Sequence, residues 1–184
     1  MYLGFKLSGL TGIERKDLLM KVAVIMGSDS DLPVLQPALD TLKEFGIAVE
    51  VLVASAHRTP DKVHTFTAGA AERGVQVMIA AAGAAAHLPG VVASFTTLPV
   101  IGIPVNSTSV GGLDALLSIV QMPAGIPVAT MAINGAKNAA LFAVQILAVA
   151  NRELAQQLVD YRSKMAAEVE RKNAALQEKL AAQV

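Results

Sequence analysis

The side chains best suited to chemistry lie in the stretch Ser55-Ala56-His57-Arg58-Thr59-Pro60-Asp61. An apolar run over residues 49–54 precedes it and predicts a buried strand. The threonine, proline and aspartate that end it suit the N-cap and first turn of a helix. His57 and Arg58 therefore fall in a short loop at the carboxyl end of a strand, where ligands bind in open α/β sheets. An imidazole can transfer protons near neutral pH, and a guanidinium can bind a phosphate or carboxylate. A plain turn with a surface arginine is the alternative interpretation.

A second polar cluster, Gly27-Ser28-Asp29-Ser30-Asp31, follows the apolar run over residues 22–26. At a strand-to-helix turn, backbone N–H groups and hydroxyls can bind a phosphate, and a carboxylate can accept hydrogen bonds from ribose hydroxyls. The alternative is that Ser30 or Asp31 only caps the helix, which would explain one residue but not the cluster. The spacing is neither a dinucleotide fingerprint nor a P-loop.

A third loop, Gly83 to Gly90, consists mostly of small residues and contains His87. Small side chains allow a backbone to approach a ligand or another subunit closely. His87 is a candidate for the same site as His57, with a buried structural histidine as an equal alternative. We interpret His64 as a surface or packing residue.

The elements that must position these loops alternate between strands and helices. The predicted strands cover residues 22–26, 49–54, 75–82, 99–105 and 127–133. The first predicted helix follows the Gly27–Asp31 cluster and ends near residue 45. The others span residues 59–73, 91–96, 113–121 and 137–150, and a long helix over 152–182 follows them. Pro37 predicts a distorted or late start of the first helix. The pattern predicts an α/β fold: a three-layer αβα sandwich around a five-stranded parallel sheet of flavodoxin-like order 2-1-3-4-5, with a long C-terminal helix.

The length of 184 residues suits one domain. We expect a loosely ordered N-terminal extension over residues 1–21, a catalytic α/β domain over 22–150 and a C-terminal helical arm over 151–184. Neither a secretory signal, nor a transit peptide, nor a long apolar run is recognisable, so we expect a cytoplasmic protein without a membrane span.

Composition narrows the class of function. The formal net charge is +0, which disfavours a nucleic acid polymer as partner. Cysteine is absent, which excludes disulfides, thiolate metal sites and cysteine nucleophiles. A metal site would need most of the 3 histidines, so we expect none. The hydrophobic fraction of 53%, much of it alanine, suggests surface buried between subunits of a homo-oligomer.

Four motifs stand in order: Gly27-Ser28-x-Ser30-Asp31, the stretch from Ser55 to Asp61, Ala86-His87-Leu88-Pro89-Gly90, and Ser118-Ile-Val-Gln-Met-Pro-Ala-Gly-Ile-Pro-Val-Ala-Thr130. Over about residues 22–150 the chain closely resembles the N5-carboxyaminoimidazole ribonucleotide mutase family of purine biosynthesis. The second and fourth motifs are long and specific.

The resemblance implies an isomerase that moves a carboxylate from the exocyclic nitrogen to ring carbon C4, giving 4-carboxy-5-aminoimidazole ribonucleotide on the route to IMP. It implies no metal, no organic cofactor, a ribonucleotide monophosphate substrate and a homo-octamer with sites at subunit contacts. By match to the family, His57 is the general acid/base and Arg58 binds anionic groups of the substrate. The other matched positions are the substrate-binding Ser28 and Asp31 and the pocket residues Ser30, Ser55 and His87.

A related branch of the family adds free carbon dioxide directly. It differs at the Arg-Thr of the histidine loop and lacks the His-Leu-Pro-Gly stretch, so this chain favours the mutase. Two departures stand out: Ala81 and Ala84 replace family glycines, and the loop over 132–138 is shorter than usual. The methyl group of Ala84 would narrow the pocket if its backbone requires a positive φ.

Two functions of other classes compete with this interpretation. A receiver-like phosphate-sensing module would need a carboxylate at the end of the third strand, which here ends in Ala82-Gly83. A purely structural assembly protein would fit the alanine-rich composition but leaves His57 and Arg58 unexplained.

Overall fold

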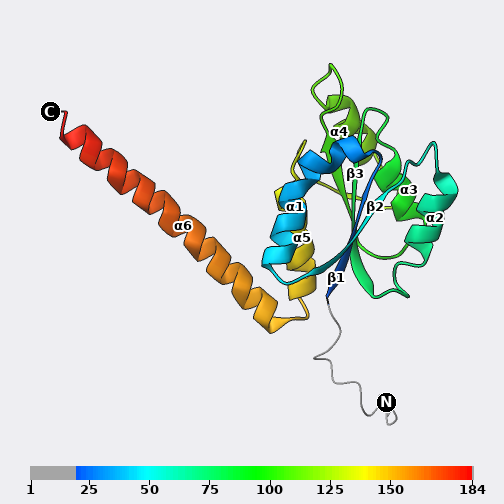
Figure 1. The fold of residues 1–184 in the computed structure, drawn as a ribbon, viewed down its shortest axis with the longest axis horizontal. Coiled ribbons are helices and arrows are strands. Elements are labelled where there is room, and N and C mark those ends of the chain that lie inside the picture. Colours follow the sequence, from blue (N-terminus) through cyan, green and yellow to red (C-terminus); the bar gives the residue numbers. More distant parts are fainter. Residues whose placement is uncertain (1–19, 184) are drawn as a thin grey trace, which may run out of the picture.

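The computed structural model describes residues 20–183 (Figure 1). The extension expected over residues 1–21 lies outside the described residues, apart from its last two. Of these, Met20 accepts a backbone hydrogen bond from Ala48, and Lys21 already begins the first strand.

The five strands form one parallel sheet in the predicted order β2-β1-β3-β4-β5. Strand β3 lies at its centre, paired with β1 on one side and β4 on the other. Its residues are almost all buried, as expected for a strand covered on both faces. The bounds are β1 Lys21–Met26, β2 Ala48–Val53, β3 Val75–Gly83, β4 Val100–Val105 and β5 Ala129–Thr130.

The helices cover both faces of the sheet, which confirms the three-layer sandwich (Figure 1). On one face, α1 (Leu32–Glu44) and α5 (Ala136–Ala148) pack on residues such as Val24 and Ile79. On the other, α2 (Pro60–Ala68), α3 (Leu88–Ser94) and α4 (Leu113–Val120) pack on residues such as Ile25 and Met78. Neighbouring residues of one strand serve opposite cores because side chains alternate along a strand.

The last helix, α6 (Arg152–Ala181), extends away from the sandwich (Figure 1). Asn151 caps it, since its side-chain oxygen accepts a hydrogen bond from the backbone N–H of Leu154 at 2.9 Å. Leu154 is buried, whereas almost the entire remainder of the helix is exposed. None of the helices within residues 20–183 combines the length and apolar character needed to cross a membrane.

Several predicted boundaries were wrong. The predicted strand over 127–133 has only Ala129 and Thr130 in the ladder, although Met131 and Asn134 still donate backbone hydrogen bonds to β4. Helix α3 begins earlier than predicted because Pro89 suits its first turn. Helix α1 runs without interruption through Pro37, against the expected distortion. Pro37 is exposed, so the carbonyl that lacks its N–H partner can face water.

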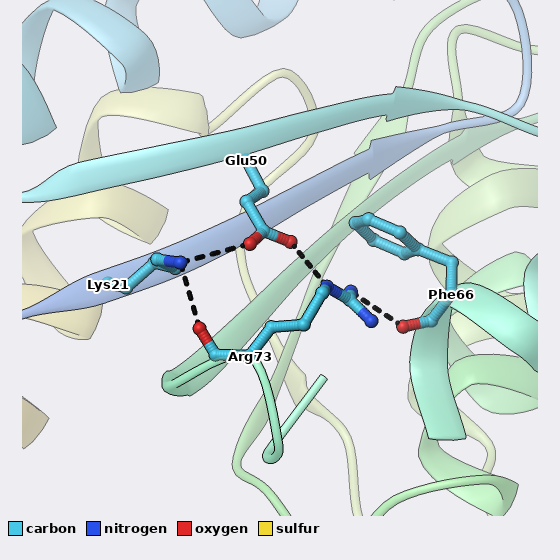
Figure 2. A network of polar contacts seen from close by, with 4 residues as sticks. All are labelled: Lys21, Glu50, Phe66 and Arg73. Atoms are coloured by element: carbon cyan, nitrogen blue, oxygen red, sulfur yellow. Dashed lines mark hydrogen bonds and ion pairs between the residues drawn. The ribbon is translucent and has the colours of Figure 1, made fainter. Parts of the chain in front are cut away.

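Helix α2 ends at Ala68, with Gly69 as its C-cap residue, and not at Arg73 as predicted. Arg73 takes part in a polar network instead (Figure 2). Its guanidinium donates to the carbonyl oxygen of Phe66 at 2.9 Å, which satisfies one of the last carbonyls of the helix. It also donates to Glu50 on β2 at 3.0 Å, and Lys21 on β1 donates to the other oxygen of Glu50 at 3.1 Å. Partial burial raises the pKa of Glu50, but the hydrogen bonds from Arg73 and Lys21 outweigh it and leave that pKa below its ordinary value. The network thus joins two strands to the segment that leads into β3.

We predict that Glu50→Gln lowers the free energy of unfolding by about 0.5–1 kcal/mol at pH 7, as expected for a partly exposed ion-pair network. A carboxyl group whose pKa is lower in the folded state stabilises the fold above its unfolded pKa of about 4.3, and the contribution disappears as the pH falls through the folded value. Urea unfolding of the parent chain and of Glu50→Gln, at pH 7 and at pH 3, measures the loss of stability and its dependence on pH. Glu72→Gln, at an exposed position, is the control. An equal loss at both pH values would contradict an ionic origin.

Candidate active site

Three loops meet at the carboxyl ends of β1, β2 and β3, and a fourth follows β4. They enclose a cavity of about 360 Å³ at the predicted switch point of the sheet. Its lining is polar on the side of β1 and β2 and consists of small residues on the side of β3. The lining residues are Gly27, Ser28, Ser30, Asp31, Ser55, Ala56, His57, Arg58, Ala82, Gly83, Ala84, Ala85, Leu88 and Ser107.

The loop after β1 forms a short 3₁₀ turn, Asp29–Asp31, held by reciprocal capping. The hydroxyl of Ser28 accepts from the N–H of Ser30 at 3.3 Å, and the carboxylate of Asp31 accepts from the N–H of Ser28 at 3.2 Å. The capping roles therefore belong to Ser28 and Asp31, not to Ser30. Burial raises the pKa of Asp31, the hydrogen bond from Ser28 lowers it, and the neighbouring Asp29 raises it; the net shift is upward.

The loop after β2 is held by its own hydroxyl groups. The side chain of Ser55 accepts from the N–H groups of His57 and Arg58, each at 3.3 Å. Thr59 is the N-cap residue of α2, but its hydroxyl accepts from the N–H of Ser55 at 2.9 Å and makes no bond to the helix. These contacts fix the backbone that carries His57 and Arg58.

The guanidinium of Arg58 reaches across to the loop after β1. One of its nitrogen atoms donates to the carbonyl oxygen of Gly27 at the long distance of 3.4 Å. Among the described residues, no carboxylate lies within ion-pair distance of Arg58. Its remaining N–H donors can therefore serve an anionic ligand.

The rings of His57 and His87 are in direct contact. Nε2 of His57 lies 2.8 Å from Nδ1 of His87, and the rings meet edge to face at 89°. Because a hydrogen bond needs one donor and one acceptor, one of the two nitrogens carries the shared hydrogen and the other presents its lone pair. The orientation of each ring therefore depends on the other.

The loop after β3 approaches the loop after β4 so closely that only glycine fits at position 83. A Cβ there would collide with the side chain of Ser107. Next to it, Ala84 has a φ of 52°, in the left-handed region. Ala84 also lines the cavity, so the positive φ under which its methyl group was expected to narrow the pocket is present.

The structure brings all the predicted site residues together. Ser28, Ser30, Asp31, Ser55, His57 and Arg58 line the cavity, and His87 joins through its contact with His57. The roles assigned to them stay predictions. Ser107 was missed, although its position in a polar loop after a strand was a usable signal. His64 is exposed and stacks edge to face on Phe95, as predicted. The described residues hold no group of three or more His, Cys, Asp or Glu side chains placed to bind a metal ion.

A parallel sheet of order 2-1-3-4-5 with a polar pocket at its switch point defines the class: an α/β protein built to hold a small polar ligand. The sequence model of AIR carboxylase matches residues 21–168. The chain belongs to the AIR carboxylase family.

Individual relatives agree with this assignment. The chain is 55% identical to the N5-carboxyaminoimidazole ribonucleotide mutase of Thermotoga maritima, over 81% of this chain and 87% of the relative. It is 56% identical to the protein of the same name from Mycobacterium tuberculosis, over 85% and 90%. The crystal structure of Treponema denticola PurE superposes with a TM-score of 0.76 at 30% identity, covering 85% of this chain and 98% of that one.

Proposed function

We propose that this chain is an N5-carboxyaminoimidazole ribonucleotide mutase that acts in cytoplasmic purine biosynthesis. It converts N5-carboxyaminoimidazole ribonucleotide to 4-carboxy-5-aminoimidazole ribonucleotide without a metal or organic cofactor. The observation that carries the proposal is the 55–56% identity, over about four fifths of the chain, to proteins with this name. The pocket supports it by combining a histidine, an arginine and several hydroxyl groups in one cavity.

Each side of the pocket suits one part of such a substrate. Arg58 and the hydroxyls of Ser28 and Ser30 suit its anionic groups. The carboxylate of Asp31 suits ribose hydroxyls, because an ionised carboxylate only accepts hydrogen bonds. A substrate held at its phosphate keeps the aminoimidazole ring in place while the carboxylate is in transit.

In the reaction, the bond from the exocyclic nitrogen to the carboxylate breaks first, and that nitrogen takes a proton as carbon dioxide leaves. Carbon C4 then attacks the trapped carbon dioxide and loses its own proton. A single group that gives a proton and takes one back serves both steps. We assign this group as His57, because imidazole changes its protonation state nearest neutral pH and His57 lines the cavity. His87 is the competing candidate.

Conversion of N5-carboxyaminoimidazole ribonucleotide, followed by ultraviolet absorbance, tests the function directly. Turnover of this compound without ATP or added bicarbonate is the expected result. Carboxylation of aminoimidazole ribonucleotide with bicarbonate alone would assign the chain to the branch that uses free carbon dioxide. Failure of both reactions would leave the binding-module and assembly interpretations.

Arg58→Ala is expected to weaken substrate binding roughly 10- to 100-fold, since a charge-assisted contact in a partly enclosed site contributes about 1.5–3 kcal/mol. Arg58→Lys keeps the charge but not the paired donors, so its affinity for the substrate should lie between that of the parent chain and that of Arg58→Ala. Titration calorimetry with the product as ligand measures the affinity, with Arg162→Ala on the exposed part of α6 as control. Unchanged affinity of Arg58→Ala would show that Arg58 does not contact the ligand.

His57→Asn should fold and bind ligand but lose at least about two orders of magnitude in kcat, the usual contribution of general acid–base catalysis. Asparagine keeps a hydrogen-bonding group near the position of the ring while it removes proton transfer. Steady-state kinetics of His57→Asn and His87→Asn, side by side, separate the two histidines. Near-normal turnover by the first with loss of activity in the second would transfer the role to His87.

We further propose a homo-oligomer, an octamer by family resemblance, with the sites at subunit contacts. Helix α4 exposes an apolar face formed by Leu113, Leu117 and Val120, each about half exposed. The opposite face of α4, with Ala115 and Ile119, is buried on the sheet, so the helix carries apolar residues on two sides, as helices covered on both sides do. The loop before α4 carries Ser107, which lines the cavity, so a subunit packed on α4 would lie beside the site. A second apolar cleft of about 540 Å³, at the amino ends of β4 and β5, also lacks a cover within residues 20–183.

Leu117→Glu is expected to dissociate the assembly, because it places a charge at the centre of the apolar face of α4. Light scattering at micromolar concentration measures the mass, and Lys43→Glu, an exposed change on α1, is the control. The parent chain running as a monomer of 19.1 kDa would refute the oligomer itself. An unchanged mass for Leu117→Glu would refute the assignment of α4 to the interface.

A further inference from the structure

The long motif from Ser118 to Thr130 contributes no residue to the lining of the cavity. Part of it lies in α4, and the rest forms the turn and extended segment that lead to β5. Any effect of its residues on the site therefore passes through another element. The contacts around Gly90 and Gly102 identify this element as α3.

The first contact is at Gly90 in α3. A Cβ at this position would lie 3.1 Å from the sulfur atom of Met122 and 3.3 Å from its terminal methyl carbon. Both distances are shorter than ordinary van der Waals contact, so the thioether of Met122 occupies the notch that the missing side chain leaves. Met122 is half-buried, and this notch determines how closely it approaches the helix.

The second contact is at Gly102 in β4, beneath the same helix. A Cβ there would lie 2.5 Å from Ile119 and 2.9 Å from Val128, and 3.3 Å from Pro89 of α3. Ile119, Met122 and Val128 all belong to the motif. Helix α3 packs on β3 and β4, and the motif residues lie against it from the side of β4.

Helix α3 has only 7 residues and starts directly after His87. A helix this short gets its position from packing and not from its own stability. The ring of His87 meets His57 at 2.8 Å, so a movement of α3 by about 1 Å away from His57 would take the two nitrogens outside hydrogen-bond range.

We propose that Met122 is a positioning residue for the site: by filling the notch at Gly90 it fixes α3, and with it the ring of His87 against His57. Met122 does not line the cavity, so we assign its effect to its contact with the helix. The proposal rests on the proposed function only in that a displaced His87 should impair turnover. The contact between the rings is itself measurable without substrate.

The test compares Met122→Ala with the parent chain. Solid-state ¹⁵N NMR of histidine-labelled protein observes the hydrogen bond between the rings, and with 3 histidines in the chain the spectrum is simple. Met122→Ala is expected to lose the signature of the contact between His57 and His87 while His64 stays unchanged. Its kcat should fall about tenfold with KM within about twofold, since the loss concerns orientation and not substrate binding.

Two further variants keep the test decisive. Met122→Leu retains apolar volume over the notch and should retain the ring contact and most of the activity, even if Met122→Ala proves too unstable to purify. Met165→Ala, on the exposed face of α6, is the matched control and should change neither. A Met122→Ala protein that keeps the ring contact overturns the proposal, whatever its stability or kcat. A parent chain without mutase turnover would refute the proposed function, while the ring contact would still decide the role of Met122.

Discussion

The candidate site depends on the close approach of chain segments around strand β3. This strand is central in the sheet, buried on both faces, and ends in Ala80-Ala81-Ala82-Gly83. Larger side chains there would separate the loops that follow β1, β3 and β4. The restriction is tightest at Gly83, because a Cβ there would lie 2.8 Å from the Cβ of Ser107 and 3.0 Å from the carbonyl oxygen of Val105. The small residues are thus a condition for forming a pocket at this edge of the sheet, and the polar residues around it supply the chemistry.

Many of the polar groups at the site form hydrogen bonds within the loops and hold the loops in shape. The carboxylate of Asp31 accepts from the N–H of Ser28, and the hydroxyl of Ser28 accepts from the N–H of Ser30. Ser55 likewise accepts from the N–H groups of the two residues that follow Ala56. Such bonds are each worth about 1 kcal/mol, so together they define the loops before any ligand arrives. Beyond these bonds, the guanidinium of Arg58, the paired imidazoles and the rotatable hydroxyls of Ser28 and Ser30 can meet a ligand, and the carboxylate of Asp31 keeps acceptor capacity. Fixed loops with a few uncommitted groups are what preorganisation requires, since little ordering remains to be done on binding.

The sequence predicted the strands from local patterns, and the sheet order 2-1-3-4-5 because it is the common order for five strands of this kind. The convergence of the loops follows from that order. Buried parallel strands are continuous apolar runs, and Gly46, with a φ of 69°, marks the end of α1. Tertiary contacts decided what was missed. Arg73, predicted as the last residue of α2, instead reaches Phe66 and Glu50 through the fold. The sequence placed His57 and His87 at the same edge of the sheet, but their 2.8 Å contact depends on how α3 rests against the sheet, and no local pattern encodes that.

Ala84 shows how strongly neighbours can impose a conformation. An alanine in the left-handed region costs roughly 1–2 kcal/mol, and a glycine at this position would avoid that cost. The conformation persists because the chain is fixed on both sides: Gly83 lies against Ser107, and the N–H of His87 bonds to the carbonyl of Ala85 at 2.8 Å. The loop therefore takes its shape from its surroundings and against the preference of Ala84. Strain of this kind survives only where the surrounding structure determines the backbone, as at this edge of the sheet.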